Sequence, residues 1–468
     1  MDAGTALVWA NSEFGFTNFG DKRRTKRAVR MAADLIDSVG RSISTTCGRS
    51  GAQAVSRFFS CETVTDETTL SCHRMRSIER CKGISGRILA IQDTTSLDFS
   101  SHKSLEGLGP TSTGKRASGI MMHSVLLTDE QKVPLGVLGV DLWCRAIDQH
   151  GQRDQRRSRH TMDKESSKWL RGLKQVNENL SDVGKEVVVI GDRESDIYDL
   201  FAAPRRANVH LLVRMCQNRS VETDDEQTCM LEAIKNADVR GNYDLRVESQ
   251  NRTARLEVKS CRVWLRPPKG RKLINGNMPC VWVVEIMEVE PAENVEPLHW
   301  ILLTTLDAGN LELSRYVAEC YSGRWSIEEF HKTLKSGCQV ERLQFETLDR
   351  LRPAIAMLCV VAQQVMFLTK YARSHGDEPA SRVCTEEERD TAEKWVLTFR
   401  YATYSIMTVR DYVRAIGFIG GFHGRKCDGE PGVKSIWQGI RDLNRLVAGR
   451  RMKPFEPAQA PLGNPIKD

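Results

Sequence analysis

The segment YSGRWSIEEFHKTLKSG contains residue types that could bind an anion and hold a cation at the same time. In a helix each residue advances by about 100° around the axis. Measured from Tyr321, Arg324 falls near ~300° and Lys335 near ~320°. Glu328 falls near ~340° on the same stripe, whereas its neighbour Glu329 falls near ~80°. The spacing therefore selects Glu328 as the acid of a stripe that also carries a phenol and two bases.

The opposite face of this predicted helix is apolar. Ile327, Phe330 and Leu334 fall between ~180° and ~240°, so the helix is expected to bury them. A polar face turned toward water would explain the stripe equally well in an arbitrary helix. A functional interpretation therefore needs partner residues elsewhere in the chain.

Two aspartates supply such partners. Asp93 follows the apolar run ILAIQ, where we expect a short strand to end, and Asp192 follows VVVIG, where we expect a strand, a glycine and then a helix. Open α/β sheets place ligand sites at such strand ends, although a turn or helix N-cap would also use an aspartate there. Three carboxylates gathered at one sheet edge suit Mg²⁺. Two such ions about 3.5–4 Å apart stabilise an in-line displacement at phosphorus.

Length and charge describe a globular protein of several domains. The chain has 468 residues, 40% of them hydrophobic, which predicts two or three domains. The net charge of +7 allows a nucleic-acid partner without requiring one. Basic residues cluster at 20–30, 153–160 and 448–453, and each cluster could equally be a solvated surface.

Cysteine usage and the N-terminus point to the cytoplasm. The 14 cysteines form no CxxC pair and no Cys/His cluster with zinc spacing, so we expect free thiols. The N-terminal segment lacks the apolar run of a signal peptide. We also expect no window of the roughly 20 apolar residues that span a bilayer.

Apolar periodicity divides the chain into segments of different character. Residues 1–85 are predicted to be helical, and residues 86–215 mix apolar strands with helices, which indicates a mixed α/β sheet. Residues 216–299 alternate polar and apolar side chains, which is typical of antiparallel strands. A further strand, WILLTTLD, precedes the helix with the polar stripe, and the last hundred residues are predicted to be helical and polar.

Three of these segments together resemble the catalytic blocks of bacterial DDE transposases of the insertion-sequence-four family. They are AIQDTTSLDF, GDRESDIYDLF and YSGRWSIEEFHKTLKSG, and the last carries the family's Y-R-E-K signature at its spacing. The resemblance covers most of the chain, including FGDKRRTKRAVRMAADL, DKESSKWL, PLHWILLTTLD and IGGFHGRKC. It implies an α/β protein with an RNase H-like core and an antiparallel β insertion at about 216–299. The implied domains are 1–75 for DNA end recognition, 76–372 for catalysis, and 373–468 for dimerisation and DNA contact.

The resemblance also implies a site and a reaction. Asp93, Asp192 and Glu328 would hold two Mg²⁺ ions, for which Mn²⁺ would substitute. They would support phosphodiester hydrolysis and strand transfer in cut-and-paste transposition, through a DNA hairpin. Trp300 would stack on a flipped base, although its place in an apolar strand alone indicates a core aromatic. The side chains expected to contact DNA are Tyr321, Arg324, Lys335, Trp300, Arg193, Arg23 and Arg24.

The implied partners are double-stranded DNA with transposon end repeats, target DNA, and a second copy of the chain in a synaptic homodimer. No membrane is expected, and the protein would lie in the bacterial cytoplasm on the nucleoid. In one close member of that family a tryptophan pair precedes the histidine that is His123 here, whereas this chain has Met121 and Met122 at those positions. Local DNA packing is therefore expected to differ.

Two other functions compete with an active transposase. A non-catalytic DNA-binding regulator could keep the fold, but it would have no need for clustered acids that repel phosphate. An RNase H-like nuclease acting on hybrids or junctions would share the carboxylates, but the flanking DNA-binding regions and Trp300 argue against it. His123 and His331 are expected to be structural residues outside any metal site.

Overall fold

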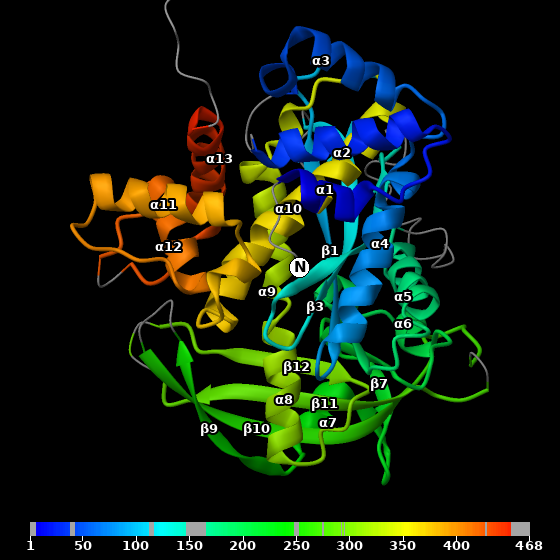
Figure 1. Cartoon of the computed structure of the whole chain (residues 1–468). Helices are drawn as coiled ribbons and strands as arrows, with labels where there is room; N and C mark the ends of the chain where they lie inside the picture. Colours follow the sequence, from blue (N-terminus) through cyan, green and yellow to red (C-terminus); the bar gives the residue numbers. More distant parts are fainter. Residues whose placement is uncertain are drawn as a thin grey trace, which may run out of the picture.

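A computed structural model gives the arrangement of most of the chain (Figure 1). It describes residues 6–450 except 38–42, 112–116, 147–164, 248–251, 274–275, 292, 294 and 426–427. The basic cluster at 153–160 lies outside the described residues, and the cluster at 448–453 lies partly outside them.

One mixed sheet runs through the described part of the chain. Its strand order is β2-β3-β1-β5-β6-β12-β11-β10-β7-β8, with β4 paired to β3 and β9 paired to β10. The strands are β1 (Ile88–Asp98), β2 (Gly109–Pro110), β3 (Ser118–Thr128), β4 (Pro134–Trp143), β5 (Val187–Gly191), β6 (Val209–Arg214), β7 (Ser220–Glu222), β8 (Gln227–Cys229), β9 (Val239–Val247), β10 (Arg252–Leu265), β11 (Cys280–Val289) and β12 (His299–Thr304).

Helices gather at both ends of the chain, with the N-terminal ones at the top of Figure 1 and the C-terminal ones at its left. The α-helices are α1 (Ala6–Phe14), α2 (Lys22–Asp37), α3 (Ile43–Phe59), α4 (Asp66–Gly83), α5 (Ser167–Asn179), α6 (Tyr198–Ala202), α7 (Met230–Lys235), α8 (Leu311–Ser322), α9 (Trp325–Lys332), α10 (Leu348–Ser374), α11 (Glu386–Phe399), α12 (Val409–Ile419) and α13 (Val433–Arg450). The described chain is thus a mixed α/β protein with a large mixed sheet and helical termini. Both inner boundaries of the predicted domains fall inside helices, α4 and α10, and the boundaries themselves stay a prediction.

The middle of the sheet is parallel and buried on both faces. Residues Ile88–Ile91 of β1 pair with Val187–Ile190 of β5, and β5 pairs in parallel with β6. Alternate side chains enter different cores, because successive residues of a strand point to opposite faces. Leu89 and Ile91 join the core that contains α9 and α10, while Ile88 and Ala90 join the core that contains α5 and α6.

The antiparallel strands between residues 216 and 299 extend the central sheet. Strand β12 pairs with β6 on one side and with β11 on the other, so hydrogen bonding continues from the parallel strands into the antiparallel ones. Figure 1 shows these strands as the lower part of the molecule, with α7 and α8 against them. The sequence predicted their antiparallel character but not their continuity with the core.

Helix α10 is the apolar centre of the molecule, and it corrects one expectation. Its 27 residues are long and apolar enough to cross a membrane by length and composition, contrary to the prediction that no such window exists. Burial explains the composition, because 78% of its most apolar window lies inside the protein. An apolar helix surrounded by other elements is typical of a core helix.

The described cysteines agree with the expectation of free thiols. The twelve cysteines among the described residues are all free. Burial raises the pKa of the Cys338 and Cys81 thiols to about 12. These thiols are therefore protonated and unreactive at neutral pH, which is typical of cysteines that serve as small core residues.

Candidate active site

Asp93 does not stand at the end of its strand. Strand β1 continues to Asp98, so the expectation of a short strand ending at Asp93 was wrong. The parallel pairing with β5 nevertheless ends at Ile91, and beyond it β1 is paired only with β3. Loss of the parallel neighbour opens space beside Asp93 and leaves its side chain only half-buried.

Asp192 follows β5 directly, as predicted, but the element after it differs. A 3-10 turn, η3 (Arg193–Ser195), follows instead of a helix, and the five-residue α6 begins only at Tyr198. Asp192 caps this turn, because its Oδ1 accepts a hydrogen bond from the Glu194 N–H at 2.8 Å. Burial raises the pKa of Asp192, and nearby Glu194 adds to that rise.

The segment with the polar stripe is not one regular helix, which corrects the geometry assumed above. Helix α8 ends at Ser322, α9 begins at Trp325, and a π-helical turn, η5 (Thr333–Gly337), follows. The break lies at Gly323, where a Cβ would come within 3.1 Å of the Leu89 side chain and 2.9 Å of the Cys320 carbonyl oxygen. Close approach of the helix to β1 therefore requires glycine at this position.

The two adjacent glutamates have different partners. Glu328 forms an ion pair with Arg324 one turn earlier, and its charge is close enough to raise the pKa of Asp93. Glu329 instead pairs with Lys370 of α10. The structure thus brings Glu328 toward the two aspartates and directs Glu329 into the contact between α9 and α10. The apolar face is buried as predicted, with Ile327, Phe330 and Leu334 all at 0% exposure.

The three carboxylates repel one another, and one arginine offsets the repulsion. Burial raises the pKa of Asp93 to about 6, and the charges of Asp192 and Glu328 add to this rise. Arg324 acts in the opposite direction and lowers the pKa of both aspartates. Because the guanidinium lies among three carboxylates, its positive charge stabilises their ionised forms.

A divalent cation fits the chemistry of this cluster. Oxygen donors that are partly buried and raise each other's pKa are the ligands that a hard cation prefers. Among the described residues, however, no three His, Cys, Asp or Glu side chains are already grouped closely enough to hold a metal ion. Glu328 is paired with Arg324 in this arrangement.

An aromatic and cationic wall borders the cluster. Trp300 at the start of β12 contacts Tyr321 at the end of α8, with ring centroids 5.9 Å apart and an interplanar angle of 64°. Arg214 at the end of β6 is electrostatically coupled to Tyr321 and Arg324. Arg193 is exposed and adds positive charge beside Arg214. The sequence analysis did not select Arg214, since a basic residue that ends a strand carries no local signal.

Lys335 lies apart from the other members of the stripe. The π turn shifts it out of helical phase, and the charges near it belong to Glu341 and Asp98. Burial lowers its pKa. The structure therefore brings together Tyr321, Arg324 and Glu328, and it places Lys335 near Glu341 and Asp98.

Lys168 is a second residue near the site that the sequence analysis did not select. Its side chain is only 5% exposed, and its Nζ lies 3.0 Å from Glu194 Oε2 in the turn that Asp192 caps. The ammonium also lies over the rings of Trp169 and Trp143, at 5.6 and 6.0 Å from their centroids. The motif DKESSKWL contains it, but a lysine in a predicted amphipathic helix gives no reason to expect burial.

The two histidines near the site have structural partners. His123 Nε2 donates to Gln92 Oε1 at 3.0 Å, its Nδ1 accepts from the Thr94 hydroxyl at 2.9 Å, and its ring packs edge-on against Trp169. His331 lies 3.2 Å from the Ser124 hydroxyl, and burial lowers its pKa to about 3. Both rings are neutral spacers between β1, β3 and the helices.

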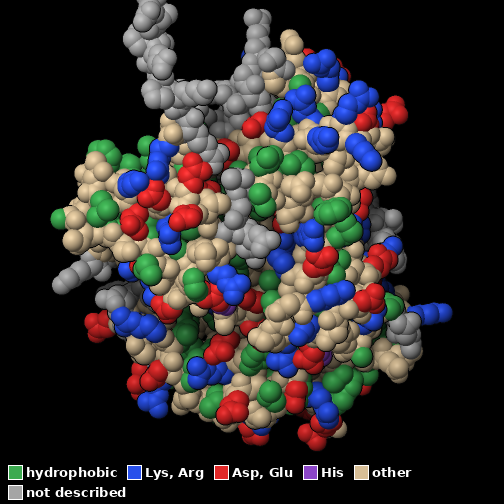
Figure 2. Space-filling view, viewed as in Figure 1, with side chains coloured by type: hydrophobic (Ala, Val, Ile, Leu, Met, Phe, Trp, Pro, Cys, Tyr) green, Lys and Arg blue, Asp and Glu red, His purple; other side chains and the backbone are tan. Residues whose placement is uncertain are grey.

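A basic groove lies at the N-terminal end of the molecule. It has a volume of about 1080 Å³ and lies between α1 and α2, with Arg23, Lys26 and Arg30 along one side. Figure 2 shows Lys and Arg side chains gathered over these helices at the top of the view. Arg23 is 92% exposed, whereas Arg24 is held by the Phe19 carbonyl and the Thr63 hydroxyl at 3.0 and 3.1 Å. Arg24 therefore has a structural role in this helix pair.

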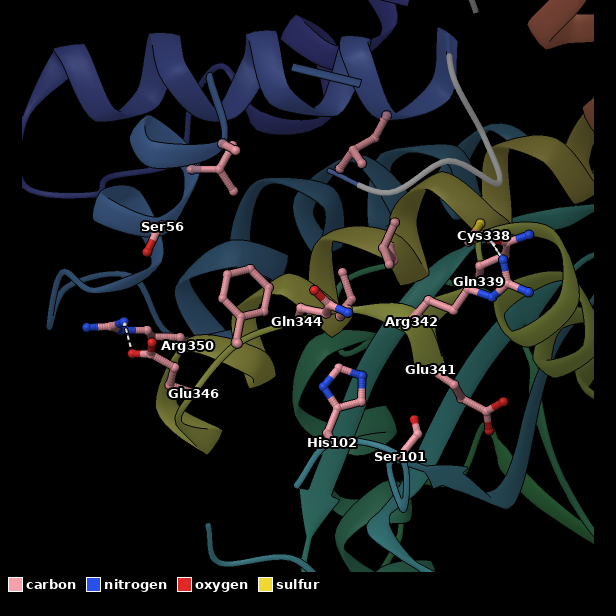
Figure 3. Close-up of a pocket in the computed structure, with 16 residues that line it drawn as sticks. Ser56, Ser101, His102, Cys338, Gln339, Glu341, Arg342, Gln344, Glu346 and Arg350 are labelled. Carbon is pink, nitrogen blue, oxygen red and sulfur yellow. Dashed lines mark hydrogen bonds and ion pairs between the residues drawn. The ribbon is translucent and has the colours of Figure 1, made fainter. Parts of the chain in front are cut away.

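A second cavity lies beside the N-terminal helices. It holds about 530 Å³ between α3 and the segment after the π turn, and Ser56, His102, Arg342 and Arg350 are among its lining residues (Figure 3). Arg350 is paired there with Glu346 at 3.5 Å. None of the three carboxylates lines this cavity.

Comparisons with known families match three consecutive regions of the chain. Residues 7–64 match a family described as transposase DNA-binding, residues 160–363 a transposase DDE domain, and residues 360–455 a transposase Tn5 dimerisation domain. Asp192 and Glu328 lie within the second match, and Asp93 lies before it. The basic groove lies within the first match.

A solved structure of the piggyBac transposase synaptic complex with hairpin DNA is also similar to the chain. The identity is 9%, the alignment covers 98% of this chain and 75% of that chain, and the TM-score is 0.34. A likeness at this level supports no conclusion about the fold or the site, which therefore depend on the geometry and the family matches above.

Removal of one carboxylate should stabilise the protein in the absence of metal. The folded-state pKa of Asp93 is raised to about 6 from 3.8, so its ionised form costs stability once the pH rises through that range. At pH 7.5 Asp93→Asn should raise the free energy of unfolding by on the order of 2 kcal/mol, and at pH 4 it should give no gain. Urea denaturation at both pH values measures this.

The same variant should lose the stabilisation that Mg²⁺ gives to the wild type, measured as a shift in melting temperature. Glu329→Gln is the matched control, and it should change the free energy of unfolding in the opposite direction. It leaves Lys370 without its ion partner and should lower stability, yet retain the shift with Mg²⁺. A destabilised Asp93→Asn at pH 7.5, or an unchanged Mg²⁺ shift in it, would contradict the proposed repulsion.

Proposed function

We propose that this chain, which is a DDE transposase, cuts DNA at the ends of its own element and joins the freed ends to target DNA. The observation that carries the proposal is the cluster of Asp93, Asp192 and Glu328 around the Arg324 guanidinium. The chain also matches DNA-binding and dimerisation families, which supports DNA as the substrate of this cluster.

The three carboxylates are the residues that would hold the metal on which DDE transposases depend. We propose Mg²⁺ in two sites, with Mn²⁺ able to substitute. When bound, the metal activates the attacking oxygen and stabilises charge on the phosphate oxygens. The chain's own contribution is a partly buried set of oxygen donors attached to a rigid sheet and to helix α9.

Arg324 has the position to exchange partners when DNA binds. In the structure it neutralises Glu328, and Tyr321 and Arg214 lie around it. A phosphate that enters beside the carboxylates would offer the guanidinium a bidentate partner. Tyr321 would donate its hydroxyl proton to the same phosphate, while Arg214 and Arg193 would attract the adjacent backbone. Phosphate positioning of this kind is the protein's main contribution to phosphoryl transfer.

Lys335 would contact the DNA backbone at a different point. Because Glu341 and Asp98 are the charges near it, its phosphate would lie along the continuation of β1 rather than at the carboxylates. This differs from the single narrow stripe that helical spacing predicted. The π turn is the reason, since such turns re-aim side chains and are frequent at functional sites.

The hairpin intermediate remains part of the proposal, and Trp300 is the residue that supports it. Its ring is half-buried at the start of β12, against Tyr321 and therefore beside the arginines. A base turned out of the duplex could stack on the face of the ring. Such unstacking relieves the strain of joining two strands in a tight turn.

The remaining finer predictions also stand as proposals. The N-terminal helices would recognise the element ends, two copies would assemble on DNA through the C-terminal helices, and the strands at 216–299 would be an insertion in an RNase H-like core. The predicted domain boundaries, membership of the insertion-sequence-four family and closeness to the transposase of transposon Tn-five belong here. So does a location in the cytoplasm, on the nucleoid.

A non-catalytic regulator is the main competing function. Clustered carboxylates repel phosphate, so a protein that only binds DNA would gain from their absence. The cost that Asp93 carries, a pKa raised to about 6, is reasonable only if a cation uses the cluster. An RNase H-like nuclease would use the same cation, but it leaves the matched DNA-binding and dimerisation regions without a role.

A cleavage assay tests the proposal directly. Duplex DNA that carries the native element ends should be cut by the full chain with Mg²⁺ and left intact with EDTA. Asp93→Asn, Asp192→Asn and Glu328→Gln should each reduce cutting by at least about 1,000-fold, because each removes one metal ligand, while DNA binding persists. Glu329→Gln should cut normally once corrected for its folded fraction. Cleavage by the carboxylate variants at the wild-type rate would exclude this site.

Trp300→Ala should separate nicking from hairpin formation. The first nick needs only the carboxylate site, whereas the hairpin also needs an unstacked base. Base–aromatic stacking contributes on the order of 1–3 kcal/mol, so hairpin formation should slow by about 10–100-fold while nicking stays close to normal. A denaturing gel time course resolves the two products. Equal slowing of both steps would indicate that Trp300 serves only to pack against Tyr321.

Binding of the element end should depend on the exposed basic side chains of the groove and on the salt concentration. Arg23→Ala and Lys26→Ala should each weaken binding and reduce the slope of log affinity against log salt by about 1, because each releases fewer counterions. Arg24→Ala should instead lower thermal stability, since it removes the contacts with Phe19 and Thr63. Unchanged salt slopes in the first two variants would place the DNA elsewhere.

A further inference from the structure

A buried cluster of charged side chains joins the N-terminal helices to the rest of the protein, away from the carboxylate site. Glu13 on α1 is 1% exposed, and His73 on α4 is completely buried. His73 Nδ1 donates to Glu13 Oε2, and Arg80 Nη1 donates to Glu13 Oε1 at 2.8 Å. Burial lowers the pKa of His73, so the neutral ring carries its proton on Nδ1.

The same two α4 side chains also contact the sheet. The Val137 N–H donates to His73 Nε2 at 2.9 Å, and Arg80 Nε donates to the Leu135 carbonyl at 2.5 Å. Gly136, between these two β4 residues, has a φ of +155°, and a Cβ there would lie 1.8 Å from the Ser77 hydroxyl of α4. Helix α4 therefore approaches β4 as closely as the backbone permits.

Helix α1 has two faces with different tasks. Leu7, Val8 and Asn11 are exposed and line the basic groove. Ala10 and Glu13 lie on the opposite face, which is buried. Because a short helix is rigid, the position of Glu13 sets the position of the groove wall.

A continuous hydrogen-bonded path leads from this cluster to the carboxylate site. Val137 of β4 pairs with Leu126 of β3, and Leu126 pairs with Ile91 of β1, two residues before Asp93. Figure 1 shows α4 running from the N-terminal helices along the sheet, so one element spans the distance. The groove and the carboxylates are thus connected through α1, α4 and three paired strands.

The cost of burying the Glu13 cluster indicates a role other than stabilising the fold. Taking a carboxylate and a guanidinium out of water is costly, and well-packed apolar residues of similar volume often stabilise as much or more. Apolar packing, however, tolerates sliding, whereas the hydrogen bonds that Glu13 accepts from two α4 side chains permit only one register.

We propose that Glu13, His73 and Arg80 are positioning residues that fix the register between the DNA groove and the carboxylate site, and so determine which phosphodiester bond is cut. This inference rests on the proposed function. The three residues touch neither DNA nor the reacting atoms, and they act through the placement of α1.

The position of the cut tests this role, because it is scored only on DNA that has been cut and is insensitive to a loss of folded protein. End-labelled duplex with the native element end is incubated with the full chain and Mg²⁺, and the products are mapped at single-nucleotide resolution. Glu13→Gln, and Gly136→Ala from the other side of the joint, should spread cuts to neighbouring bonds. Cutting at the wild-type bond should fall by about 100-fold, the effect of a misplacement near 1 Å.

Binding of the same duplex should stay within about threefold of wild type, since the groove itself is intact. Lys82→Gln is the control, because Lys82 is an exposed charge on the same helix, and it should leave the pattern unchanged. A single wild-type cut position in both joint variants, with binding and cutting reduced in parallel, would overturn the inference. Absence of any cleavage by the wild type would instead overturn the proposed function.

Discussion

The repulsion among Asp93, Asp192 and Glu328 is the constraint on which the site depends. Three carboxylates cannot remain ionised together at a sheet edge without a cation, and in the structure the guanidinium of Arg324 supplies part of that charge. The same arginine is the natural ligand for a phosphate. In the proposed function one side chain would therefore serve both the metal-free and the DNA-bound state of the site, and a binder without chemistry would have no reason to keep such a cluster.

The sheet holds the mutually repelling carboxylates in position. Asp93 and Asp192 are attached to adjacent parallel strands whose register is fixed by buried side chains on both faces. Glu328 comes near them on α9, which follows the break at Gly323, where the backbone lies close to Leu89 of β1. Glu329 is tied to Lys370 of α10, so α9 cannot rotate without losing a partly buried ion pair. Rigid elements thus hold three like charges near each other against their mutual repulsion.

Coupling between regions follows from elements that belong to two regions at once. Helix α4 carries both the joint to α1 and the hydrogen bonds to β4. Helix α10 fills the core and contacts the N-terminal and C-terminal helices. At the far end, Asn444 of α13 bonds to Asp37 of α2 at 2.7 Å. The described chain is therefore packed as connected parts, although its family matches divide it into three.

The sequence by itself determined the features that depend on local periodicity. Helical spacing separated Glu328 from Glu329, apolar runs located β5 and the aspartate that follows it, and alternation identified the antiparallel strands between residues 216 and 299. These patterns are set by neighbours within a few positions, and so they can be read from the chain alone.

Only the tertiary structure decided the features that depend on distant contacts. Strand β1 continues past Asp93 because β3 pairs with it along its whole length, and the stripe is broken because Gly323 packs against Leu89. Lys335 leaves the stripe through a π turn, while Arg214 and Lys168 enter the site from elements far away in sequence. Each of these outcomes is fixed by packing between segments more than 20 residues apart or by a helical irregularity, and neither leaves a periodic signal in the sequence.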